Sequence, residues 1–176
     1  MPCPASGHNA RMSEHTRTYT WIDPKFNPEK IKHLSGLEYL RGIARGEYAP
    51  APIAATLGMM ELRPEDITEG RVVFRFQPEG FHYNPIGSVH GGVFATLLDS
   101  AVGCAVQTTL PAGAGYTTLE LKVNFIRPLL AGGPSVQAIG EVIHTTRQTG
   151  IAEGRIVDEN GKLYAHCTTT CLIWRG

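Results

Sequence analysis

The chain has 176 residues, of which 42% are hydrophobic and 18% are charged. These values fit one globular domain with a core of its own and exclude a disordered chain. Sixteen basic residues balance sixteen acidic ones, so no net charge attracts nucleic acid or an anionic membrane, although a local basic patch is still compatible with these counts. The longest apolar stretch, residues 93–106, is too short to cross a membrane. We therefore expect no nucleic-acid partner and no membrane association.

The amino-terminal residues and the cysteines set the expected domain layout and location. Residues 1–27 are polar and rich in Pro, Ser, His and Thr, without the charged-then-apolar order of a signal peptide. We expect them to form a loosely held tail in front of a single domain over residues 28–176. The four cysteines include no Cys-x-x-Cys pair and no zinc-type His/Cys cluster, which favours a reduced, cytoplasmic setting.

The first half of the domain is expected to contain a helix followed by two strands. Asn27-Pro28 is a good helix start, and an apolar face then continues as far as Ala44. Two prolines break the chain before a strand expected near residues 53–62. Alternating apolar residues predict a second strand over Arg71–Gln77.

The second half is expected to contain one buried helix and four strands. The helix is predicted from about Gly91 to Thr108, because this stretch is apolar almost throughout. Asn160-Gly161 predicts a tight hairpin between the last two strands. With only one buried helix available, an antiparallel sheet wrapped around it is the economical arrangement, which makes the fold class α+β. The four strands are expected near residues 116–127, 135–145, 150–157 and 162–173.

One acidic residue interrupts the apolar helix. Between Glu79 and Glu120 the only Asp, Glu, Lys or Arg is Asp99. Burial of an ionised carboxylate costs several kcal/mol unless a partner compensates. The helical neighbours of Asp99 at three and four residues include no cation, so local pairing cannot stabilise it. We therefore expect Asp99 to be a buried acid with a function.

The start of the same helix has the features of an oxyanion site. Gly91 and Gly92 present backbone N–H groups without intrahelical partners, and the helix dipole adds partial positive charge. Asn84 and His90 lie just upstream and can hydrogen-bond a carbonyl or a water. Together with Asp99 these groups suit acyl transfer to water. Taken singly, the double glycine also suits a turn, and His90 also suits a helix cap.

As a set, the spacing Asn84-x5-His90-Gly91-Gly92-x6-Asp99 resembles that of the hotdog-fold thioesterases. The nearest branch is the phenylacetic-acid-degradation (PaaI-type) group, within the 4-hydroxybenzoyl-CoA thioesterase-like family. The likeness extends over about residues 36–174, and it includes the segments 36–47, 117–125 and 158–163.

The resemblance implies a hotdog fold, in which a curved antiparallel sheet wraps one long helix, here with an extra N-terminal helix. It also implies a homodimer with its sheets joined edge to edge, pairs of dimers forming a homotetramer, and active sites at the dimer interface. Asp99 would be the nucleophile or the base that activates water, and the Gly91 N–H would polarise the thioester carbonyl. Asn84 and His90 would position the thioester, and Thr118 would orient the water. Strand parity puts Thr118 opposite the face of its apolar neighbours, so this last role needs a bulge or a partner subunit.

The implied substrate is an acyl-CoA, with aromatic and medium-chain acyl groups as candidates, and no metal or other cofactor is required. Small and polar residues are expected to contact the substrate and the phosphates of CoA, namely Gly92, Arg127, His144, Arg147 and Gln148.

Other functions fit the sequence less well. A non-catalytic acyl-CoA-binding hotdog protein would lack the acid, and a hotdog hydratase or dehydratase usually pairs an acid with a differently spaced His. A serine hydrolase is not indicated, because Ser88 does not lie in a Gly-x-Ser-x-Gly motif. A metal site built from His82 and His90 would need two further ligands that the nearby sequence does not supply.

Overall fold

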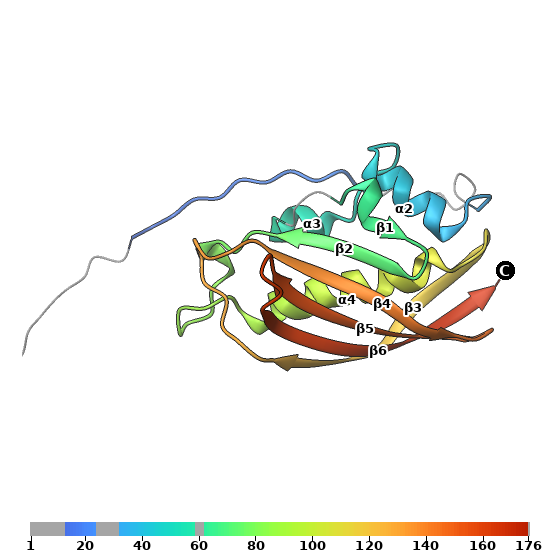
Figure 1. Cartoon of the computed structure of the whole chain (residues 1–176). Coiled ribbons are helices and arrows are strands. Elements are labelled where there is room, and N and C mark those ends of the chain that lie inside the picture. Colours follow the sequence, from blue (N-terminus) through green and yellow to red (C-terminus); the bar gives the residue numbers. More distant parts are fainter. Residues whose placement is uncertain (1–12, 24–31, 59–61, 176) are drawn as a thin grey trace, which may run out of the picture.

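A six-stranded antiparallel sheet wraps around one long helix, as Figure 1 shows. The computed structural model describes residues 13–23, 32–58 and 62–175. The strand order β1-β2-β4-β5-β6-β3 puts β3 at one edge of the sheet. The α+β hotdog architecture expected from the sequence is therefore confirmed. The strands are β1 (Ile67–Thr68), β2 (Arg71–Phe76), β3 (Ala114–Phe125), β4 (Val136–Thr145), β5 (Thr149–Asp158) and β6 (Leu163–Arg175).

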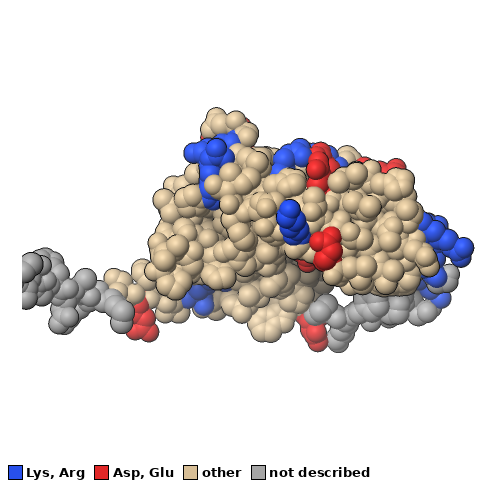
Figure 2. Space-filling model, turned by 90° about the horizontal axis from the view of Figure 1, so that it is seen from below, with Lys and Arg blue, Asp and Glu red and all other residues tan. Residues whose placement is uncertain are grey.

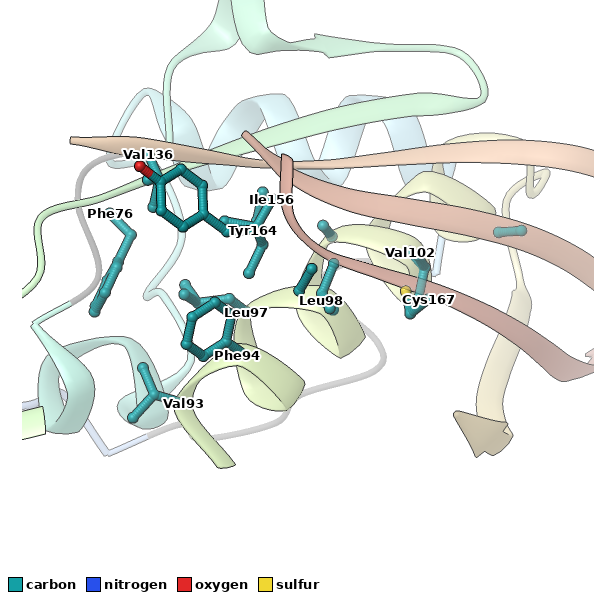
Figure 3. Packing of buried hydrophobic residues seen from close by; sticks show 14 of the residues in the cluster. Phe76, Val93, Phe94, Leu97, Leu98, Val102, Val136, Ile156, Tyr164 and Cys167 are labelled. Atoms are coloured by element: carbon teal, nitrogen blue, oxygen red, sulfur yellow. The ribbon is translucent and has the colours of Figure 1, made fainter. Parts of the chain in front are cut away.

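The central helix, α4, spans Gly91–Thr108, which are the bounds predicted from its apolar composition. Its buried side chains Leu97, Leu98 and Val102 lie against Ile156 and Cys167 of the sheet, as Figure 3 shows. Burying a side chain of this size contributes about 1.5–3 kcal/mol. The hydrophobic effect therefore fixes which face of α4 meets the sheet and which face stays open.

The first described helix starts later than predicted. Helix α2 spans Gly36–Ala44, and Ser35 caps it in a capping box with Glu38. Residues 32–34 form a turn and a bend, so the helix predicted from Pro28 is wrong over these residues, and residues 28–31 lie outside the described part of the chain. The cap explains the difference, because the Ser35 side chain accepts the Glu38 N–H and the Glu38 carboxylate accepts the Ser35 N–H.

The strand predicted near residues 53–62 is also wrong. Pro52–Leu57 form a short helix, α3, and residues 59–61 lie outside the described part of the chain. Pro52 occupies the first turn, where its missing N–H costs nothing, and Gly58 ends the helix in the left-handed conformation with φ 61°. Residues 13–23 are extended without regular structure and reach beyond the body of the domain (Figure 1), and Arg17 donates to the carbonyls at the end of α3.

On the outer face of the sheet, an ion-pair network links three strands. Glu141 on β4 accepts hydrogen bonds from Arg155 on β5 at 2.5 Å and from Arg71 on β2 at 3.2 Å. The hydrogen bond from Arg155, and then that from Arg71, lowers the pKa of the Glu141 carboxyl below its usual range. This polar network contrasts with the apolar face that packs on α4.

Candidate active site

A β-bulge brings Thr118 to Asp99. In the β3–β6 ladder Thr118 pairs with Cys171 and Glu120 pairs with Thr170, so Leu119 is an extra residue with no partner. Because of this extra residue, Thr118 lies on the sheet face that packs against α4, and its hydroxyl donates to the Asp99 Oδ1 at 2.9 Å. Regular strand alternation predicted that Thr118 faces away from the helix. The bulge within the chain reverses this, so no partner subunit is needed to bring Thr118 to Asp99.

Asp99 itself is exposed in the single chain, so the expectation of a buried acid is wrong at this level. Its position on α4 lies next to the edge strand β3, beyond which the sheet of one chain does not continue. Water can therefore reach the carboxylate, and no cation is needed to offset its desolvation. The Asp99 carboxylate also affects a neighbouring thiol. Burial raises the pKa of Cys104 to about 12, and the negative charge of Asp99 adds to this increase.

Aromatic side chains of β3 contact two glycines of α4, one at its start and one in its second half. A Cβ on Gly103 would lie 2.8 Å from the Tyr116 hydroxyl, and a Cβ on Gly91 would lie 3.1 Å from the Phe125 ring. Burial raises the pKa of Tyr116 above its usual range. Sequence reasoning identified Gly91 but missed Tyr116 and Phe125 as the aromatic partners of α4. The strand spacing that aligns Tyr116 and Phe125 with α4 includes the bulge, which the sequence alone does not reveal.

His90 is the N-cap of α4. Its Nδ1 accepts the Gly92 N–H at 2.8 Å, so the proton of the neutral ring sits on Nε2. This bond uses the Gly92 N–H, one of the donors at the helix tip. The Gly91 N–H stays available, because it has no acceptor within the described part of the chain. The capping role of His90 therefore selects Gly91, rather than Gly92, as the open donor.

A surface hollow of about 350 Å³ lies beside the Gly91 N–H. Asn84 lines it, and its side chain holds the preceding loop in shape by accepting the N–H groups of Ile86 and Ser88. Arg127 lines the other side and donates to the Leu163 carbonyl. Apolar side chains complete the wall, namely Val89, Phe94, Phe125, Ile126 and Pro128. The hollow thus combines one free backbone donor with an apolar wall.

The acid and the free donor are far apart within one chain. Asp99 follows Gly91 by eight residues on the same helix, which separates them by about 12 Å along its axis. A single thioester carbonyl needs both groups within about 3 Å of the reacting atoms. One chain therefore holds two halves of a site rather than a complete one.

The residues expected around CoA are divided as well. Arg127 lies in the hollow next to Gly91, whereas Arg147 and Gln148 line a second hollow at the turn between β4 and β5. His144 is exposed on β4 and lines neither hollow. Within a single chain these side chains therefore lie at different places, and their contact with CoA stays a prediction.

The described residues hold neither a metal-type cluster nor a membrane-spanning helix. Over residues 13–23, 32–58 and 62–175, no three His, Cys, Asp or Glu side chains gather as metal ligands do. Over the same ranges, no helix has the length and apolar character needed to span a bilayer.

Comparison with known proteins places this geometry in a family. The family model of the thioesterase superfamily matches residues 86–165. A putative esterase of Halobacterium salinarum is 33% identical over 106 residues, which cover 57% of this chain and 68% of that protein. The 1,4-dihydroxy-2-naphthoyl-CoA hydrolase of Listeria monocytogenes is 28% identical over 107 residues, covering 61% of this chain and 84% of the hydrolase.

A solved structure agrees with these sequence matches. The PaaI protein from the phenylacetic acid degradation operon of E. coli superposes with a TM-score of 0.66 at 25% identity, over 81% of this chain and 97% of PaaI. The fold and the family match thus define a hotdog thioester hydrolase. The chain belongs to the thioesterase superfamily.

Proposed function

We propose that this protein hydrolyses acyl-CoA thioesters to the free acid and CoA, with Asp99 as the base or nucleophile. The observation that carries this proposal is the 2.9 Å hydrogen bond from the Thr118 hydroxyl to the Asp99 carboxylate. This bond fixes the orientation of an acid that lies on the central helix and is accessible to water. The similarity to an aroyl-CoA hydrolase and to PaaI supports a CoA ester, with an aromatic acyl group as the first candidate.

The tip of α4 supplies the oxyanion donor. As the carbonyl carbon becomes tetrahedral, its oxygen gains charge, and the free Gly91 N–H is placed to donate to it. Asn84 lines the same hollow; its amide nitrogen donates one N–H to the Ser88 hydroxyl and keeps the second to position the thioester. His90 keeps the helix tip in place through its bond to Gly92. Gly92 leaves the approach to the tip free of side-chain bulk.

Two chemical routes use these same groups. In the first, Asp99 takes a proton from a water that attacks the carbonyl, and Thr118 holds the carboxylate in line. In the second, the Asp99 carboxylate attacks directly, and water then hydrolyses the mixed anhydride. In both, the carbon–sulfur bond breaks, the thiolate leaves and takes up a proton, and the products are a carboxylic acid and the CoA thiol.

We infer that each complete site is built by two chains. The edge strand β3 has twelve residues, and its outer edge has no strand partner within the described part of the chain. Its side of the molecule carries few charged side chains, as Figure 2 shows, and Leu119 and Phe125 are 58% and 59% exposed. Such an edge invites pairing with a second copy. Antiparallel pairing of two β3 strands would set two α4 helices side by side in opposite directions. Asp99 of one chain then approaches Gly91 of the other.

The direct test removes the acid without changing its shape. In Asp99→Asn, kcat for acyl-CoA hydrolysis, followed as thiol release, should fall at least about a thousandfold while the oligomeric state is kept. The matched control Glu120→Gln makes the same chemical change on the outer face of β3 and should stay within about twofold of wild type. A near wild-type rate in Asp99→Asn would contradict the proposal. Tight binding of a panel of acyl-CoAs without any thiol release would favour a non-catalytic binding protein instead.

A further inference from the structure

A second hollow, of about 320 Å³, lies at the far end of the sheet edge. Side chains of the β4–β5 turn and the end of β6 line it, namely Arg147, Gln148, Leu172, Ile173, Trp174 and Arg175. No acidic residue is among them, and within the described part of the chain neither of the two guanidinium groups forms an ion pair. The hollow is therefore cationic and partly apolar, which suits an anionic ligand with a flat apolar part.

The indole of Trp174 is displayed as a platform. Its cross-strand partner is Gly115, and a Cβ built on Gly115 would lie only 2.6 Å from the indole ring. The ring therefore occupies the space that any other side chain on β3 would fill, and it rests against the backbone of that strand. It is still 51% exposed. One side is supported and the other is accessible to solvent, which is the arrangement in which an aromatic ring can stack on a base.

We propose that this second hollow binds the adenine nucleotide of CoA, with adenine stacked on Trp174. Arg147 and Arg175 would pair with its phosphates, because guanidinium groups match phosphate geometry in two-pronged hydrogen bonds. The Gln148 carboxamide offers both a donor and an acceptor to the purine edge. This inference rests on the proposed function, since it names the part of a CoA ester that lies away from the thioester, and it adds Trp174 and Arg175 to the substrate-binding residues.

The position of the hollow fits a site shared by two chains. Gly115 and Trp174 lie at the start of β3, whereas Phe125, which lines the hollow at Gly91, lies at its end. The two hollows of one chain are thus separated by the length of the strand. Antiparallel pairing of two β3 strands puts the start of one beside the end of the other. The nucleotide hollow of one chain and the thioester hollow of its partner then lie at the same end of the paired strands. Trp174 faces away from α4, whereas Phe125 faces Gly91 of α4, so the pantetheine arm would pass around the end of the paired strands.

A binding experiment tests this without relying on catalysis. The chain has two tryptophans, so Trp21→Phe leaves Trp174 as the only indole. Adenosine 3′,5′-bisphosphate should quench the fluorescence of this variant in a saturable way, and Arg147→Ala should weaken the binding about tenfold. In the matched variant Trp174→Phe, the remaining Trp21 should show no saturable quenching. Absence of saturable quenching in Trp21→Phe, with its fold intact by circular dichroism, would overturn the inference.

A kinetic experiment separates this inference from the proposed function. One acyl group is presented both as its CoA ester and as its pantetheine ester, which lacks the nucleotide. Wild type should favour the CoA ester in kcat/KM by about tenfold or more, and Trp174→Ala should lower this ratio about tenfold, mainly through KM. Trp21→Ala should leave the ratio unchanged. Equal hydrolysis of both esters by wild type would overturn the nucleotide site and keep the thioesterase. Hydrolysis of neither ester would overturn the proposed function and leave the fluorescence result to decide on the nucleotide.

Discussion

Proline at the first residue of α4 should keep the helix and remove the proposed oxyanion donor, with the ring Cδ in place of the amide hydrogen. Gly91 is the first residue of the helix, where the N–H has no intrahelical partner and where proline is well tolerated. His90 before it has ψ 139°, the extended conformation that a residue preceding proline prefers. Gly91→Pro therefore deletes one N–H at the helix tip. Loss of an oxyanion donor costs about 2.7–4 kcal/mol of transition-state stabilisation, which corresponds to about a hundred- to thousandfold in kcat.

The control for this change is Gly91→Ala. It adds a Cβ at the same place, 3.1 Å from the Phe125 ring, but keeps the N–H. The ring has to move by a few tenths of an ångström in both variants, so their difference reports the change at the backbone nitrogen, where proline replaces the N–H by its Cδ. We expect kcat of Gly91→Ala to stay within about tenfold of wild type and kcat of Gly91→Pro to lie at least about tenfold below it, with thiol release from an acyl-CoA as the assay. Equal kcat values in two folded variants would refute the role of this N–H.

Two further predictions concern the carboxylates. Thr118→Val removes the hydroxyl that donates to the Asp99 carboxylate at 2.9 Å. A hydrogen bond to a charged group contributes about 1.5–3 kcal/mol, so kcat should fall about 10- to 100-fold if Asp99 acts as proposed. Thr117→Val, on the opposite face of the strand, is the control, and an equal effect of the two changes would argue against the assignment. Glu141 has a lowered pKa, so its ion pairs stabilise the fold above its usual pKa of 4.5, and this stability is lost as the pH falls through the lowered value. Glu141→Gln should therefore show a flatter decline of unfolding free energy below about pH 4.5 in urea titrations, and parallel curves would contradict this.

The fold was predictable wherever one periodicity dominated. The apolar run from Gly91 to Thr108 and the alternating strands after it left little ambiguity, and Asn160-Gly161 located a hairpin that the structure confirms. The errors came from segments where capping decides the structure. Residues 53–62 were predicted as a strand because they are apolar, but Pro52 and Gly58 delimit a short helix there. Such short apolar segments carry no periodicity that distinguishes helix from strand.

The candidate site was predictable as a set of residues but not as a geometry. The sequence identified Asp99, Gly91 and Thr118, and the structure adds the bulge at Leu119 that brings Thr118 to the acid. A bulge shifts the in–out alternation of side chains by one residue, and the sequence has no turn residue or glycine at this point from which the bulge could be predicted. The exposure of Asp99 was missed for a different reason. An apolar helix predicts burial, but it does not say whether the covering surface belongs to the same chain.

The central claim is that one chain supplies the acid and its partner supplies the oxyanion donor. It is tested most directly by mixed dimers of Asp99→Asn and Gly91→Pro chains, co-expressed with two different affinity tags and purified through both. Each homodimer should be nearly inactive. In the mixed dimer one site carries both defects and the other carries neither, so the account predicts about half of the wild-type kcat per dimer. If acid and donor act within one chain, both sites are defective, and a mixed dimer no more active than the two homodimers would contradict the claim.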